Sequence, residues 1–240
     1  QIARWREAGE GRPCDVMIDT GMNRLGLRVE EAAGGALNGL TIETLLSHLA
    51  SADEDSEQNA RQLAAFRAIR QAIPARRYSL ANSAGICLGT DYGFDLTRPG
   101  IALYGGTPRR EAVGNIRQVV FPEARVLQVR EVRQGETVGY GATWTAGRDS
   151  RIAVANIGYA DGYLRCHAET GGARFDGQAL PLVGRVSMDL VAFDATSIEG
   201  GAEGDWLALD YGLAATAARC GLSQYELLTG LGRRFERGWI

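Results

Sequence analysis

Apolar and polar residues follow one pattern up to about residue 112 and another beyond it. In the first part, short apolar runs alternate with segments whose apolar residues recur at helical spacing. Buried strands are expected over 14–19, 41–50, 78–82 and 98–106, and helices over 30–37, over 56–73 and from residue 83. The long helix carries apolar residues from Leu63 to Ile73 on one face. Such βα repeats predict a parallel sheet, in either a (β/α) barrel or a doubly wound fold.

The second part, from residue 113, carries β-branched runs that alternate with glycine-containing turns. The runs cover 124–132, 150–158, 184–195 and 205–210. Short strands joined by tight turns predict an antiparallel β domain. A closing helix is expected over 214–231, interrupted by Gly221. Two domains are therefore expected, 1–112 and 113–240.

The first part is short for a closed barrel. It offers about four βα strands, whereas a closed barrel uses eight in about 250 residues. Half a barrel would leave two unpaired strand edges. The sequence also begins without methionine, in a segment with the character of an amphipathic helix. We therefore expect roughly a hundred or more residues to precede Gln1 in the natural protein.

Charge and hydropathy exclude some classes of partner. The 240 residues carry a formal net charge of -3, with no basic stripe, so nucleic acid is not an expected partner. No apolar run approaches the roughly 20 residues that span a bilayer, and no signal peptide is recognisable.

The cysteines and histidines are few and scattered. Cys14, Cys87, Cys166 and Cys220 form no C-x-x-C pair, and His48 and His167 are the two histidines. A metal site is therefore not expected, and the thiols suit a reducing cytosol better than a disulfide framework. Cys166 and His167 are adjacent, but sequence neighbours rarely face each other, so a catalytic pair is not expected either.

Every one of the 26 basic residues is arginine, and the chain contains no lysine. A bias of the whole proteome toward arginine would be a sufficient cause. Whatever the cause, the chain offers no side-chain amine that could form a Schiff base.

Five glycine-punctuated stretches lie where loops are expected. They are IDTGMNRLG at 18–26, NSAG at 82–85, RPGIALYG at 98–105, NIGYADGYLR at 156–165 and GRVSMD at 184–189. In this order and spacing they resemble the alanine racemase family over nearly the whole chain. The resemblance implies a pyridoxal-phosphate enzyme with an α/β part followed by an all-β part. Here these would be the C-terminal half of a (β/α)8 TIM-like barrel and an antiparallel β domain.

The resemblance implies a phosphate site around Ser83. Ser83 with Asn82, and the backbone at Gly100 and Ile101, would hold the cofactor phosphate, and a helix N-terminus after a strand suits an anion. The alternative is that Ser83 only caps its helix. Arg98 would donate a hydrogen bond to the pyridine nitrogen and, because it stays charged, would keep that nitrogen unprotonated. Alone, Arg98 would more often be a structural arginine in an ion pair.

Tyr159 precedes an Asp-Gly turn that would expose it at a loop tip. The resemblance makes Tyr159 the acid/base that exchanges the α-proton on the L-alanine face. An ordinary tyrosine has a pKa near 10 and needs help to act as a base. The resemblance implies a chain from Tyr159 through His48 to Arg98, and these three are the expected catalytic residues. Without it, His48 would be an ordinary histidine at a strand end.

Arg24 lies in a loop after the first strand, where an ordinary surface arginine would serve equally well. The resemblance implies that it reaches the substrate carboxylate and the phenolic oxygen of the cofactor, which suits a planar, charged side chain. Met188 would touch the same carboxylate through its backbone N–H, with Asp189 behind it. The alternative for Met188 is a core residue of a strand.

Two family features are missing from the sequence. The family's cofactor-binding lysine is absent, and Met17 stands where a second lysine, often carbamylated, would lie. The 240 residues alone are therefore expected to lack racemase activity, although the complete protein would interconvert L- and D-alanine. The resemblance also implies a head-to-tail homodimer in which Tyr159 enters the partner's barrel, and a cytoplasmic location is expected. The alternatives are a racemase for serine or a broader range, a related decarboxylase, and a non-catalytic cofactor-binding or interaction protein.

Overall fold

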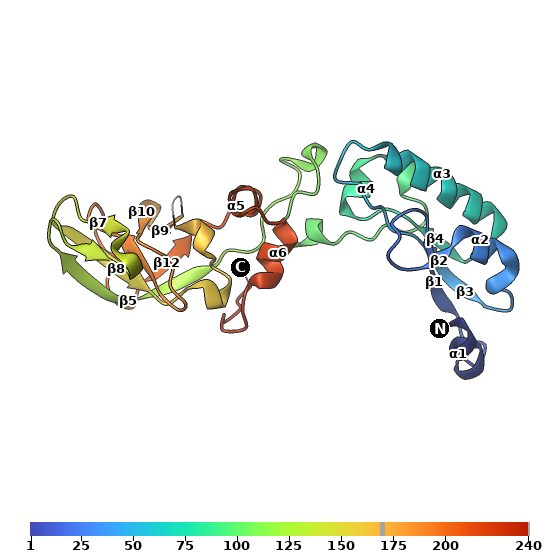
Figure 1. Cartoon of the computed structure of the whole chain (residues 1–240), viewed down its shortest axis with the longest axis horizontal. Coiled ribbons are helices and arrows are strands. Elements are labelled where there is room, and N and C mark those ends of the chain that lie inside the picture. Colours follow the sequence, from blue (N-terminus) through green and yellow to red (C-terminus); the bar gives the residue numbers. More distant parts are fainter. Residues whose placement is uncertain (169–170, 240) are drawn as a thin grey trace. The chain divides into compact units, whose positions relative to one another are not determined.

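The computed structural model describes residues 1–168 and 171–239. The chain divides into two compact units, Gln1–Ile116 and Arg117–Ile240 (Figure 1). Among the described residues, none of the helices has the length and apolar character needed to cross a membrane.

A four-stranded parallel sheet in the order β2-β1-β3-β4 forms the centre of the first unit. Its strands are β1 (Cys14–Asp19), β2 (Leu27–Arg28), β3 (Ile42–Leu46) and β4 (Arg77–Ser79). Val16 pairs with Leu45, and Leu45 pairs with Tyr78, so the three longer strands end at one edge of the sheet. The loops that leave this edge carry the predicted site residues of the unit.

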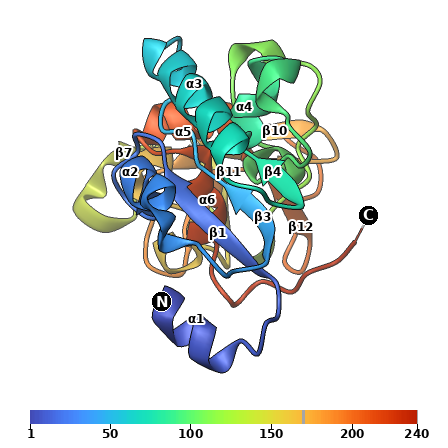
Figure 2. The same ribbon diagram turned by 90° about the vertical axis from the view of Figure 1, so that its right-hand side faces the viewer.

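The helices of this unit lie before, between and after its strands. They are α1 (Ile2–Ala8), α2 (Val29–Glu31), α3 (Glu57–Ala72) and α4 (Ser83–Cys87), with the π-helical η1 (Ala32–Ala36) and the 3-10 helices η2 (Thr90–Tyr92), η3 (Ile101–Tyr104) and η4 (Arg110–Ala112). Figures 1 and 2 show α3 crossing one face of the sheet. Ser56 caps α3 by accepting the Gln58 N–H, and Phe66 packs in the same core as Ile18 and Leu45. The helix predicted over 56–73 is confirmed.

The strand predicted over 98–106 is wrong. Arg98 makes a single parallel bridge with Asn82, and the chain then turns into η3. Pro99 has no N–H to donate, and the N–H groups of Gly100 and Ala102 donate to a side chain instead of a neighbouring strand.

The second unit is a closed antiparallel barrel with the strand order β10-β11-β8-β5-β12-β9. Its strands are β5 (Glu123–Val132), β8 (Ser150–Ala155), β9 (Gly172–Phe175), β10 (Gln178–Val183), β11 (Val191–Asp194) and β12 (Trp206–Leu209), and β6 (Thr137–Val138) pairs with β7 (Trp144–Thr145). Phe193, Leu180 and Leu207 are fully buried in its core. The unit is therefore an antiparallel β domain, as predicted. Because the barrel is closed, none of its six strands is left as an unpaired sheet edge.

Two details of this unit differ from the prediction. Residues 184–190 form a loop rather than a strand, and only β11 is extended within 184–195. The predicted closing helix is two helices, α5 (Leu213–Cys220) and α6 (Gln224–Gly230), because α5 ends at Gly221 and Ser223 caps α6 in a box with Glu226. The remaining turns are η5 (Tyr140–Ala142), η6 (Tyr159–Asp161) and η7 (Arg165–His167).

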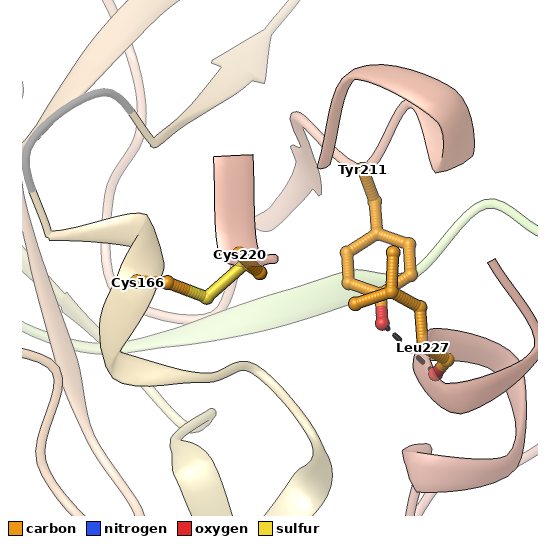
Figure 3. Close-up of a disulfide and its surroundings, with 4 residues drawn as sticks. All are labelled: Cys166, Tyr211, Cys220 and Leu227. Carbon is orange, nitrogen blue, oxygen red and sulfur yellow. Dashed lines mark hydrogen bonds between the residues drawn. A yellow bond between two sulfur atoms is a disulfide. The ribbon is translucent and has the colours of Figure 1, made fainter. Parts of the chain in front are cut away.

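The expectation of scattered free thiols is also wrong for one pair. Cys166 in η7 and Cys220 at the end of α5 form a disulfide, with Cα atoms 5.2 Å apart (Figure 3). The two cysteines are separated by 54 residues in sequence, so only the packing of α5 against η7 brings them together. Cys14 and Cys87 are free.

Candidate functional site

The loop after β1 is closed by the carboxylate of Asp19. Its Oδ1 accepts the Gly21 N–H at 2.8 Å and its Oδ2 accepts the Arg24 N–H at 3.1 Å. Burial opposes ionisation, but the backbone N–H groups of this loop outweigh it and lower the pKa of Asp19. Gly26 ends the loop with a left-handed φ of +122°, where a Cβ would lie 2.9 Å from the Met17 carbonyl oxygen. The loop therefore presents Arg24 on a fixed, exposed turn.

His48 lies two residues beyond β3, against Arg98. An Arg98 guanidinium nitrogen is 3.5 Å from His48 Nδ1, and the same guanidinium donates to the Ser47 carbonyl and the Ser79 hydroxyl. Burial, followed by the charges of Arg98 and Arg24, lowers the pKa of His48, so its imidazole is neutral near pH 7. Burial also lowers the pKa of Arg98. His48 and Arg24 line one small cavity at this edge of the sheet.

Ser83 lies in the first turn of α4, after β4. It is 5% exposed, and its Oγ accepts the Gly100 N–H at 2.8 Å and the Ala102 N–H at 3.3 Å. Asn82 is the residue that caps α4, because its Oδ1 accepts the Gly85 N–H at 2.8 Å. The alternative that Ser83 is only a helix cap is therefore wrong. Ser83 instead joins the start of α4 to the start of η3.

Tyr159 is the first residue of η6 in the second unit, and backbone hydrogen bonds connect η6 to the loop 187–190. The Tyr159 N–H donates to the Ser187 carbonyl and the Ala160 N–H to the Met188 carbonyl, both at 3.0 Å. Met188 lies in this loop and is 54% exposed, so its alternative as a core residue of a strand is wrong. The unit therefore brings together two of the glycine-punctuated stretches, 156–165 and 184–189.

Two arginines outside the predicted site residues, Arg165 and Arg234, support this arrangement. Arg234 donates to Asp161 Oδ1 and to Asp189 Oδ1, each at 2.7 Å, and the Asp161 side chain is 7% exposed. Arg165 places its Cζ 4.9 Å from the centre of the Tyr159 ring. Arg165 closes the stretch NIGYADGYLR and could have been considered from it, whereas no pattern in the sequence marks Arg234.

The predicted site residues thus form two groups. One edge of the first unit carries a group able to bind an anion and hold a neutral imidazole: Arg24, His48, Asn82, Ser83, Arg98, Gly100 and Ile101. The second unit carries a phenol, Tyr159, beside Met188 and the ion-paired Asp189. The approach of Tyr159 to His48 and Arg98 stays a prediction.

Comparison with known proteins matches both units. A model of the alanine racemase N-terminal domain matches residues 1–108, and one of the alanine racemase C-terminal domain matches residues 119–239. An alanine racemase of Acidiphilium cryptum is 44% identical over 98% of this chain and 69% of its own length. A biosynthetic alanine racemase of Agrobacterium fabrum is 42% identical over 100% of this chain and 68% of its own length.

Solved structures of alanine racemases match the chain as well. The alanine racemase of Bartonella henselae with covalently bound pyridoxal phosphate has a TM-score of 0.86 and 36% identity, over 100% of this chain and 70% of that one. The biosynthetic alanine racemase of Pseudomonas aeruginosa has a TM-score of 0.83 and 34% identity, over 100% of this chain and 71% of that one. The fold is therefore that of these enzymes, and the chain belongs to the alanine racemase family.

Proposed function

We propose that this chain provides the cofactor and substrate contacts of a pyridoxal-phosphate-dependent racemase that interconverts L- and D-alanine. The observation that carries the proposal is the edge of the parallel sheet where Arg98, His48 and Ser83 come together in a chain matched by both domain models. The names of its relatives favour alanine over the other amino acids that the sequence left open.

The donors at this edge fit the non-covalent contacts of such a cofactor. Ser83 is buried and lies at hydrogen-bonding distance from two backbone N–H groups, at Gly100 and Ala102, which together suit a phosphate near Ile101. Arg98 is held in place by three neighbouring groups and offers a fixed charged donor to a ring nitrogen. The cofactor, when bound, supplies an electron-withdrawing ring that stabilises the charge left by loss of the α-proton.

The remaining residues act on the substrate. Arg24 offers a charged fork to the substrate carboxylate, and Met188 offers its backbone N–H with Asp189 behind it. Tyr159 Oη takes the α-proton on one face and returns it from that face in the reverse direction. His48, neutral and beside Arg98, relays charge toward Tyr159. A lysine amine for the opposite face is absent from the 240 residues.

The missing amine and the four-stranded sheet lead to the finer proposal for the fold. We infer that the first unit is the C-terminal half of a (β/α)8 barrel, which pairs its open edges with further strands. The proposed domains are 1–112 and 113–240. A head-to-tail homodimer in which Tyr159 serves the partner's site completes this arrangement.

A cytoplasmic location is also part of the proposal. Its support is the pair of free thiols, Cys14 and Cys87, which would be exposed to oxidation elsewhere. In that compartment the Cys166–Cys220 pair is expected to be reduced for most of its lifetime.

A chimera tests the function directly. The part of the Acidiphilium cryptum relative that this chain does not cover is fused to the 240 residues, and D-alanine formed from L-alanine is measured by chiral chromatography. The chimera is expected to racemise alanine, and Tyr159→Phe is expected to remove turnover while cofactor binding stays. Turnover that survives Tyr159→Phe, or a folded chimera without turnover, would refute the proposal.

A further inference from the structure

A cluster of two sulfur atoms and an imidazole lies in the second unit, outside the proposed active site. Cys166 and His167 come from η7, and Cys220 ends α5. One ligand atom from each lies within 4.8 Å of the other two. Thiolate sulfur and imidazole nitrogen are the ligands that Zn²⁺ prefers in proteins.

His167 is a buried side chain without the partners that such a side chain needs. It is fully buried, and neither ring nitrogen has a hydrogen-bond partner among the described residues. The faces of the ring are covered by Tyr163, with centroids 4.0 Å apart, and by Tyr211 at 5.8 Å, so bonding must occur at the ring edge. A buried nitrogen without a partner is destabilising, and coordination of an ion is one way to satisfy it.

The two cysteines of the cluster are less buried than His167. Cys166 and Cys220 are half-buried, which leaves a path for a small reductant or an ion.

Reduction of the Cys166–Cys220 disulfide would free both sulfur atoms to act as metal ligands. A thiol reductant such as a dithiol gives two electrons to the Cys166–Cys220 bond, is itself oxidised to a disulfide, and leaves two Cys thiols. Two sulfur ligands of a tetrahedral Zn²⁺ lie about 3.8 Å apart, since each Zn–S bond is about 2.3 Å. Cα atoms 5.2 Å apart allow this separation by side-chain rotation.

We propose that the reduced chain binds one Zn²⁺ through Cys166 Sγ, Cys220 Sγ and a ring nitrogen of His167, with water in the fourth position. Binding displaces the two thiol protons and gives His167 the partner that it lacks. The ion joins η7 to α5 in the same place as the disulfide. The sequence alone does not predict this group of three ligands, because 54 residues separate Cys166 from Cys220.

Cobalt binding tests the site. The 240-residue chain is reduced with a phosphine, freed of metal and titrated with Co²⁺, which reports thiolate ligands through a charge-transfer absorption band. The band is expected at one Co²⁺ per chain and is expected to disappear when Zn²⁺ is added in equal amount. Cys166→Ser and Cys220→Ser should each lose it, whereas the double variant Cys14→Ser with Cys87→Ser should keep it.

A second measurement on the unaltered chain removes the dependence on variant folding. After Zn²⁺ is added, each cysteine is alkylated and located by peptide mass mapping. Protection of Cys166 and Cys220, with Cys14 and Cys87 still reactive, is the expected result. Absence of the band, its persistence in both single variants, or equal alkylation of all four cysteines would overturn the proposal.

Discussion

Burial, followed by the charges of Arg98 and Arg24, lowers the pKa of His48, which leads to a prediction for a single residue. Arg98→Gln removes the larger of the two charges that lower the pKa of His48, so this pKa should rise toward 6.5. Arg24→Gln should raise it less. The measurement is an NMR titration of the imidazole protons, which is simple because the chain has two histidines.

The sign of the stability effect follows from the same shift. Because the folded pKa of His48 lies below 6.5, the unfolded chain binds the proton more readily, and the free energy of unfolding should fall as pH drops below about 6.5. This loss should be smaller in Arg98→Gln. Arg61→Gln, at an exposed position on α3, is the control, and a titration unchanged by Arg98→Gln would show that the contact is absent.

Ser83 supports a second prediction at this scale. Ser83→Ala removes the acceptor of two N–H groups, so the unfolding of the first unit should become about 1–3 kcal/mol easier and the Gly100 and Ala102 amides should exchange faster. Hydrogen exchange measures both effects. Thr90→Ala, which removes an exposed hydroxyl, should leave these amides as protected as before.

Site residues in the glycine-punctuated stretches could be predicted from the sequence, because glycine and polar residues follow a buried strand there. Arg24, Ser83 and Arg98 belong to this class. Arg234 could not be predicted as part of the site. It acts by hydrogen bonding to two carboxylates, Asp161 and Asp189, which lie 73 and 45 residues away in the chain. Pairings of that range depend on the fold and leave no local pattern.

Elements were predicted well where the hydrophobic period was long and unbroken. The strand over 14–19 matches β1, and the helix over 56–73 matches α3 to within a residue or so at each end. The predictions failed over 98–106 and 184–190. Apolar residues are present there, but the Gly100 N–H donates to the Ser83 side chain, and the carbonyls of the second segment accept from η6. The hydrophobic periodicity of a sequence does not indicate which hydrogen-bond partners the backbone N–H and carbonyl groups will have.

The contact between η6 and the loop 187–190 gives a prediction for an element. A Cβ on Gly158 would lie 2.2 Å from the Met188 carbonyl oxygen, although the φ of −162° suits any residue. Gly158→Ala should therefore force the two segments apart, lower the melting temperature and displace Tyr159. Gly147→Ala has no atom within 4 Å of the new Cβ and is the matched control. Equal melting temperatures for the two variants would contradict the described packing.

For the whole molecule, composition sets a limit on activity. A protein made of these 240 residues has no lysine amine, so we predict that it does not racemise alanine even with added pyridoxal phosphate. The measurement is D-alanine formation over a long incubation, with the chimera described above as the positive control. Turnover by the 240 residues alone would mean that another group takes the place of the amine.

The surface of the second unit bears on the proposed dimer. Val119, Phe121, Leu127 and Trp206 are each more than half exposed and line one groove. Exposed apolar surface of this kind marks an interaction site. If a second copy covers it, a charge there would face a desolvated contact, which is costly without a partner.

Phe121→Glu is therefore expected to shift the sedimentation coefficient of the chain from that of a dimer to that of a monomer. Tyr225→Glu places the same charge on an exposed aromatic position of α6 outside the groove and should leave the dimer intact. Because Tyr159 is proposed to act in the partner's site, the same Phe121→Glu change in the chimera should remove turnover in proportion to the monomer fraction. A monomeric chimera with full turnover would place Tyr159 in the site of its own chain.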